Sequence, residues 1–110
     1  MISIFDRNNF YIYFRKEEFV TVVFFKQNSI EFVGHAKQSE VCHGISAVGN
    51  MVANYLEDHQ QCKVVRKDGH MLIYDINDTD LMDNPLIEAL KTALKDIQTE
   101  YPDNLEIKYV

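Results

Sequence analysis

The sequence predicts an α+β fold, a two-layer sandwich in which two main helices pack on a mainly antiparallel sheet. Two stretches carry apolar residues at the three-and-four spacing of an amphipathic helix. Pairs of short β-rich runs joined by turn residues predict hairpins before each helix. A chain of 110 residues with 46% hydrophobic residues can bury one core, so we expect a single domain.

The part of the chain before the first helix is predicted as two hairpins. Its β-rich runs cover residues 2–5, 10–14, 19–25 and 30–33. Polar turn-forming residues separate the first run from the second and the third from the fourth. The second hairpin is expected to end at Gly34 and His35.

The first helix is predicted from Val41 to about His59, where apolar residues recur on one face. Ser39 is its expected N-cap. Gly44 and Gly49 lie inside this helix, and each costs about 1 kcal/mol relative to alanine. We therefore expect close packing against a sheet or a partner to compensate for them.

The second helix has clear boundaries. Asn84 is a suitable N-cap, Pro85 follows at the first helical position, and Pro102 lies beyond the end. Its apolar stripe consists of Ile87, Leu90, Leu94, Ile97 and Tyr101.

Two more β features are predicted. Runs at 62–65 and 71–76 flank Asp68 and Gly69, a strong hairpin signal. Residues 105–109 alternate apolar and charged side chains, which is typical of a half-buried strand.

The charge balance narrows the classes of partner. A formal net charge of -6 opposes direct nucleic-acid binding, because phosphates need clustered Lys and Arg side chains, and it favours a basic partner. The N-terminus has no uninterrupted apolar segment, so we expect a soluble, cytoplasmic protein without a membrane partner. In the cytoplasm thiols stay reduced, and both Cys42 and Cys62 are expected to be free.

One pair of residues has the chemistry of a catalytic site. His35 is expected at a strand end and Cys42 in the first turn of a helix, with the six residues 36–41 between them. The helix dipole and a nearby imidazole both favour a thiolate. Free N–H groups of that turn, including that of Cys42, can receive the oxyanion of acyl transfer. From spacing alone, the alternative is a buried helix cysteine and a hydrogen-bonded strand-end histidine.

A short motif in this segment resembles the Prp family of ribosomal-processing cysteine proteases. The family shows Gly-His-Ala, a loop, and then Val-Cys-Ala-x-x-Ser. The matching residues here are Gly34, His35, Ala36, Val41, Cys42 and Ser46. The order of predicted elements is also similar from about residue 19 onward. We therefore expect one domain over residues 1–110, with an N-terminal extension at 1–18 and a Prp-like core at 19–110.

The resemblance implies a hydrolase of ribosome biogenesis, a thiol protease that removes an N-terminal extension from large-subunit ribosomal protein twenty-seven. By the same resemblance Cys42 is the nucleophile, His35 is the proton acceptor, and Gly34 and Ser46 are supporting residues. It also implies a homodimer. We expect no cofactor, and no metal, since the histidine and cysteine spacing fits no standard zinc module.

The motif departs from the family in three places. The loop between His35 and Cys42 is shorter, Ser39 stands where the family has Asp, and His43 replaces the Ala after the cysteine. His43 projects about 100° around the helix from Cys42, which favours a solvent-facing side chain. These departures leave an alternative: a non-catalytic protein-interaction module on the same scaffold, which binds a ribosomal or other basic protein without cleaving it.

Overall fold

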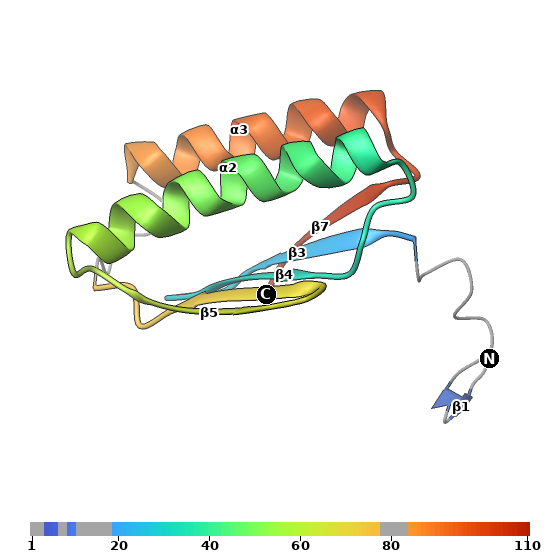
Figure 1. Cartoon of the computed structure of the whole chain (residues 1–110), viewed down its shortest axis with the longest axis horizontal. Helices are drawn as coiled ribbons and strands as arrows, with labels where there is room; N and C mark the ends of the chain where they lie inside the picture. The colour runs from blue at the N-terminus through green and yellow to red at the C-terminus, as the bar shows by residue number, and fades with distance from the viewer. Residues whose placement is uncertain (1–3, 7–8, 11–18, 78–83) are drawn as a thin grey trace.

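The computed structural model describes residues 4–6, 9–10, 19–77 and 84–110. Within them, two helices pack on one face of a five-stranded sheet (Figure 1). The predicted α+β arrangement is therefore confirmed. The elements in chain order are β1 (Ile4–Asp6), β2 (Asn9–Phe10), β3 (Thr21–Phe25), β4 (Ile30–Val33), α2 (Ser39–Asp58), β5 (Lys63–Lys67), β6 (His70–Tyr74), α3 (Pro85–Glu100) and β7 (Leu105–Tyr109).

The five-stranded sheet has the order β5-β6-β4-β3-β7. Three neighbouring pairs are antiparallel, and β3 pairs with β7 in parallel, with Val23 opposite Ile107. The separate pair of β1 and β2 is antiparallel, as predicted for the first hairpin. The remainder of that predicted hairpin, residues 2–3 and 11–14, lies outside the described residues.

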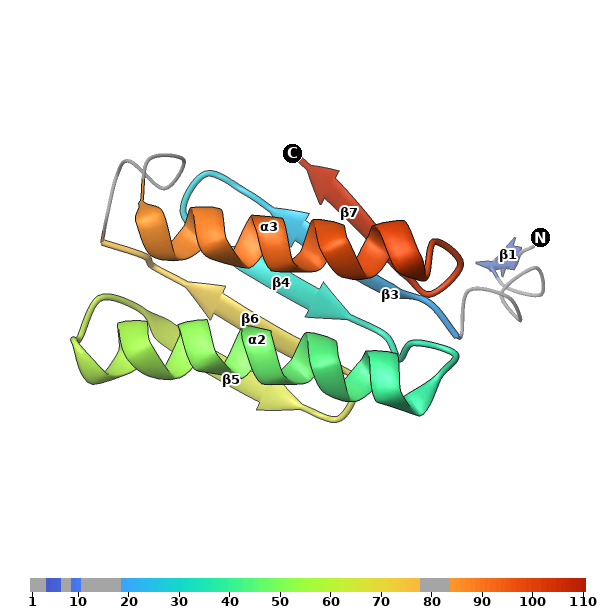
Figure 2. The same cartoon turned by 90° about the horizontal axis from the view of Figure 1, so that it is seen from above.

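The two helices run side by side in opposite directions over the sheet (Figure 2). As predicted, Asn84 caps α3: its side chain accepts a hydrogen bond of 2.9 Å from the Leu86 N–H, and Pro85 takes the first helical position. The predicted cap of α2 is wrong by one residue. Ser39 is already helical, and Gln38 is the N-cap, without a side-chain capping bond. No described helix is both long and apolar enough to cross a membrane.

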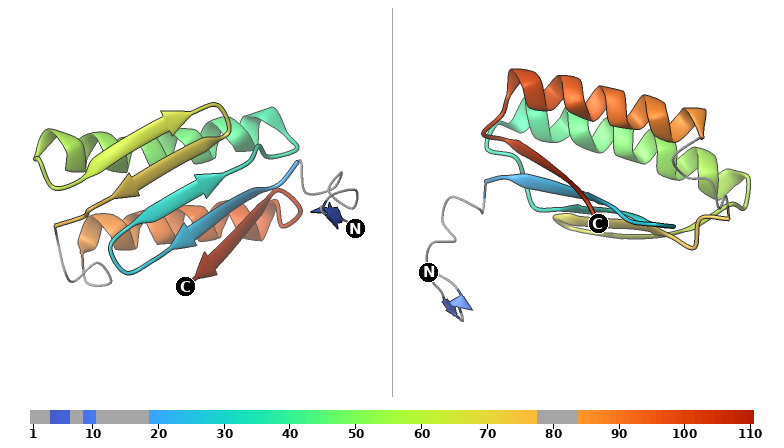
Figure 3. Two further views of the ribbon diagram at one scale, coloured as in Figure 1. Left: turned by 90° about the horizontal axis from the view of Figure 1, so that it is seen from below. Right: turned by 180° about the vertical axis from the view of Figure 1, so that it is seen from behind.

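The core lies between the sheet and the helices. Alternate residues of the inner strands point into it, so Thr21, Val23 and Phe25 of β3 are all buried. In both views of Figure 3 the two helices lie on the same face of the sheet, and no described helix covers the other face. The sequence predicts one buried face on β7. Leu105 on that face is buried, whereas Tyr109 is 57% exposed and stacks on Phe25.

The two helical glycines have different surroundings. A Cβ on Gly49 would lie 3.0 Å from both Met71 Cε and Phe32 Cζ, so the predicted close packing against the sheet is confirmed there. A Cβ on Gly44 would meet only Ile97 Cδ1, at an ordinary 3.9 Å. Close packing therefore explains Gly49 and leaves Gly44 without a reason in the described residues.

Candidate active site

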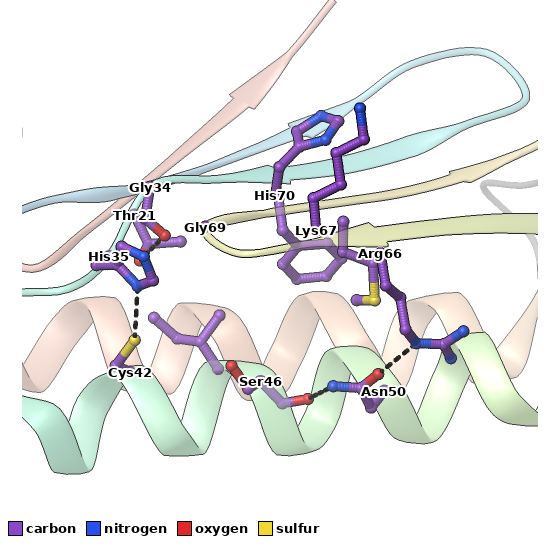
Figure 4. A pocket seen from close by; sticks show the side chains of 13 residues that line it. Thr21, Gly34, His35, Cys42, Ser46, Asn50, Arg66, Lys67, Gly69 and His70 are labelled. Atoms are coloured by element: carbon purple, nitrogen blue, oxygen red, sulfur yellow. Dashed lines mark hydrogen bonds between the residues drawn. The ribbon is translucent and has the colours of Figure 1, made fainter.

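Cys42 and His35 face each other across the gap between α2 and the sheet. The Cys42 Sγ lies 3.8 Å from the His35 Nδ1, which is within hydrogen-bond range for sulfur (Figure 4). The His35 side chain is 53% exposed, and Cys42 is half-buried in the first turn of α2. The structure thus brings together the two groups that the sequence analysis predicted as nucleophile and base, at a place that solvent can reach.

A cavity of about 160 Å³ opens beside this pair. Its apolar lining comes from Phe32, Ile45 and Met71. Among its polar lining residues, Arg66 points toward α2, whereas Lys67 and His70 point away from it (Figure 4). A peptide segment entering here would meet apolar side chains next to the sulfur.

The Arg66 guanidinium is held against α2 by three side chains. It donates hydrogen bonds of 3.0 Å to Asn50 and 2.8 Å to Asn54, and it lies 3.6 Å from the Glu57 carboxylate. The Asn50 amide in turn donates to the Ser46 carbonyl over 2.9 Å. Because of these contacts, the cavity wall carries a fixed cation, although the whole chain is acidic.

Gly34 sets the direction in which His35 leaves the sheet. Its φ of +92° is unfavourable for other L residues, and an added Cβ would lie 2.5 Å from the Val20 carbonyl oxygen. The Gly34 N–H donates to the Gly69 carbonyl over 2.8 Å, and its own carbonyl accepts from the Thr21 hydroxyl over 3.4 Å. Only glycine fits this place without moving the backbone.

Gly34→Ala should therefore destabilise the fold by about 1–3 kcal/mol, from the unfavourable φ alone, with the contact to Val20 adding to that cost. Urea denaturation measures the change. Gly44→Ala is the matched control, since its Cβ meets no close neighbour and alanine favours a helix by up to about 1 kcal/mol. Equal stability of Gly34→Ala and the unsubstituted protein would contradict this account of Gly34.

The loop between His35 and α2 is fixed at its far end by Asn104. The Gln38 N–H donates a 2.8 Å hydrogen bond to the Asn104 side-chain oxygen, and Asn104 is only 5% exposed. The Asn104 carbonyl also accepts from the Thr21 N–H over 3.0 Å. Through its side chain and its backbone carbonyl, this one buried residue therefore ties the start of α2, which carries Cys42, to the start of β3.

The first N–H groups of α2 do not all remain free. Those of Val41 and Cys42 both donate to the Gln38 carbonyl over 3.1 Å. The expectation that the Cys42 N–H is available for an oxyanion is therefore wrong, because Cys42 lies far enough into the helix to close its first hydrogen bond. The N–H groups of Ser39 and Glu40 have no acceptor within the part of the chain that the structure describes.

The turn between β5 and β6 lies against the outer side of His35. The Asp68 carboxylate is 3.6 Å from the His35 Nε2. A Cβ added to Gly69 would lie 3.0 Å from the same nitrogen, so the backbone of this turn contacts the imidazole directly. The two ring nitrogens of His35 therefore face different groups, Nδ1 the thiol and Nε2 the turn.

The other candidate residues lie apart from this pair. His43 is exposed, as expected. Cys62 borders a different cavity, and burial, followed by the Glu57 carboxylate, raises the pKa of its thiol. The described residues contain no cluster of three or more His, Cys, Asp or Glu side chains arranged to hold a metal ion.

Sequence reasoning did not find several residues of the site, among them Thr21, Asp68, Gly69 and Asn104. Asp68 and Gly69 were recognised as a turn, but nothing local shows that this turn meets the loop after β4. Asn104 comes shortly after the end of α3 in the chain, and its side chain accepts a hydrogen bond from Gln38, 66 positions earlier. The register of the folded strands is needed to bring these residues to the site.

The family model described as Cysteine protease Prp matches residues 19–106. None of the curated proteins matches the chain.

Several solved structures have a similar fold. The essential ribosomal processing protease Prp from S. aureus, with a covalently linked product peptide, is 24% identical, with a TM-score of 0.69 over 83% of this chain and 100% of that one. With a substrate peptide, that protease gives 22% identity and the same TM-score and coverage. A Streptococcus mutans protein is 21% identical, with a TM-score of 0.60 over 82% of this chain and 91% of that one. At these identities the likeness establishes the fold.

Proposed function

The chain belongs to the cysteine protease Prp family, and we propose that Cys42 is its nucleophile and His35 its proton acceptor. The observation that carries the assignment is the 3.8 Å approach of the Cys42 Sγ to the His35 Nδ1 at the mouth of a cavity. Cys62 has no such neighbour among its described contacts, and its raised pKa disfavours the reactive thiolate.

In the proposed reaction, the Cys42 thiol passes its proton to the His35 Nδ1, and the thiolate attacks the carbonyl carbon of the scissile peptide bond. The carbon–nitrogen bond breaks as Nδ1 returns that proton to the leaving amine, and an acyl thioester stays on Cys42. Water then attacks the thioester while His35 accepts its proton. The carbon–sulfur bond breaks, the acid is released, and His35 passes the proton to the sulfur, which restores the thiol. The sum is hydrolysis of one peptide bond, and it requires no cofactor.

The oxyanion of the tetrahedral intermediate needs hydrogen-bond donors near the sulfur. The N–H groups of Ser39 and Glu40, which have no acceptor in the described residues, are the proposed donors at the start of α2. Gly34 supports the site by aiming His35, and Ser46 supports it as part of the cavity wall one turn after Cys42.

The proposed substrate is a large-subunit ribosomal protein that carries an N-terminal extension. The S. aureus relative is a ribosomal processing protease, and two structures of it hold a product or a substrate peptide. A net charge of -6 suits a basic ribosomal protein, although the Arg66 side of the cavity does not contribute to that attraction. The reaction would take place in the cytoplasm, where ribosomal proteins are made.

We include a homodimer in the proposal on the strength of the family resemblance. Met51 and Tyr55 are 54% and 50% exposed one turn apart on α2, which gives this helix an apolar surface compatible with a second copy.

The test is to incubate the protein with the extended form of large-subunit ribosomal protein twenty-seven and to follow the masses of the products. We expect one cut, giving the mature protein and the free extension. The mature form of the same protein, which lacks the extension, is the control substrate and should stay intact. If the extended form also stays intact while Cys42 reacts readily with iodoacetamide, the ribosomal substrate is wrong.

A further inference from the structure

We propose that Asp68 is a positioning residue for His35, fixing the tautomer in which Nδ1 is free to take the proton of Cys42. The inference rests on the proposed function, because it assigns a role beside the same pair. Its basis is the distance of 3.6 Å between the Asp68 carboxylate and the His35 Nε2, on the side of the ring opposite the sulfur.

A neutral imidazole carries its proton on one nitrogen only, and the hydrogen bond or charge at one nitrogen decides the state of the other. A carboxylate beside Nε2 favours a proton there, which leaves the lone pair of Nδ1 directed at the Cys42 thiol. Without the carboxylate, a larger share of the imidazole carries its proton on Nδ1, and that tautomer cannot accept the thiol proton. Asp68 thereby raises the fraction of His35 that can act as a base.

The same carboxylate favours the ionised pair once the proton has moved. The imidazole ring lies between Asp68 and Cys42, so the negative charge of Asp68 is close to the imidazolium and farther from the thiolate. Attraction to the imidazolium therefore exceeds repulsion of the sulfur. The carboxylate therefore favours both the tautomer that can act as a base and the charge-separated pair that follows proton transfer.

Two contacts hold the turn that carries Asp68 against the segment of Gly34 and His35. The Gly69 carbonyl accepts the 2.8 Å hydrogen bond from the Gly34 N–H, immediately before His35 in the chain. The Gly69 Cα also packs so closely on the His35 ring that a Cβ would lie 3.0 Å from Nε2. Asp68 and His35 therefore lie on two backbone segments that are joined by a hydrogen bond.

Asp68 is 99% exposed, so solvent and salt screen its charge, and the expected effect is moderate. Asp68→Asn keeps a turn-forming residue and removes only the charge. Its matched control is Asp58→Asn, which removes the same charge from an exposed position at the other end of α2, roughly 24 Å from Cys42 along the helix axis.

The experiment measures the rate at which iodoacetamide modifies Cys42 between pH 5 and pH 9, with the modified peptide identified by mass. At an ionic strength of about 10 mM, Asp68→Asn should react about threefold to fivefold more slowly near neutral pH, within the range measured for exposed ion pairs. In 1 M salt, where the screening length is about 3 Å, the two rates should converge. Asp68→Glu should restore most of the rate, and Asp58→Asn should match the unsubstituted protein.

An unchanged rate in Asp68→Asn at low salt would overturn the inference, as would an equal loss in Asp58→Asn, which would indicate a general charge effect. Because the readout is thiol reactivity, it does not depend on the choice of substrate. A different result is that the protein shows the salt-dependent effect of Asp68→Asn on alkylation and yet leaves the ribosomal precursor uncut. That combination would count against the proposed substrate alone.

Discussion

Replacing Cys42 with alanine should abolish peptide cleavage, lowering kcat/KM on the order of 10⁴-fold or more. The variant has no nucleophile to form the thioester, and water alone must attack a peptide carbonyl. The fold should remain, because Cys42 is half-buried and alanine favours the helix. The measurement compares initial cleavage rates of the extended ribosomal precursor at equal enzyme concentration, with thermal unfolding recorded for each protein.

Cys62→Ala is the matched control, because it removes the other free thiol of the described residues. Cys62 borders a different cavity from Cys42. It should keep its cleavage rate within about twofold of the unsubstituted protein, as expected for a substitution away from the reacting groups. Equal losses of activity in the two folded variants would remove the basis for assigning the reaction to Cys42.

Replacing His35 with glutamine should lower kcat/KM by about 10²- to 10⁴-fold, the usual contribution of a general acid–base group. Glutamine retains a polar side chain near Cys42 and Asp68 but has no group that accepts the thiol proton at neutral pH. The loss should be smaller at high pH, where hydroxide supplies part of the thiolate. Cleavage rates between pH 6 and pH 10 measure both effects.

His43→Gln provides the same chemical change at the neighbouring histidine. His43 follows Cys42 directly in the chain, but its side chain is exposed and has no described contact with the sulfur. Its cleavage rate should remain unchanged within about twofold. A larger loss in His43→Gln than in His35→Gln would mean that the base is misassigned.

The sequence predicted the secondary structure well where short-range signals are strong. Asn84 and Pro85 marked the start of α3 correctly because a cap and a fixed φ act within one turn. Asp68 and Gly69 marked the third hairpin for the same reason, and Gly69 has the positive φ, of 74°, that the turn requires. The start of α2 was less well defined, since Gln38 caps it without a side-chain bond.

The order of the strands in the sheet could not be predicted from such short-range signals. The parallel pairing of β3 with β7 joins segments about 80 residues apart, and their alternation of apolar residues is compatible with several neighbours. This pairing brings Asn104 beside Thr21 and Gln38. The insertion of β6 next to β4 likewise brings Asp68 to His35. Local spacing together with the family motif therefore singled out His35 and Cys42, whereas Asp68 and Asn104, which lie around this pair in the fold, were not predicted as part of the site.

The central claim is that the reactivity of the protein resides in one thiol, that of Cys42. The most direct test is to treat the protein with a limiting amount of iodoacetamide, map the modified cysteines by peptide mass, and measure the remaining cleavage of the precursor. Burial raises the pKa of the Cys62 thiol, so Cys42 should be modified first, and the activity lost should equal the fraction of Cys42 modified. Full activity in protein whose Cys42 is completely alkylated would contradict the account.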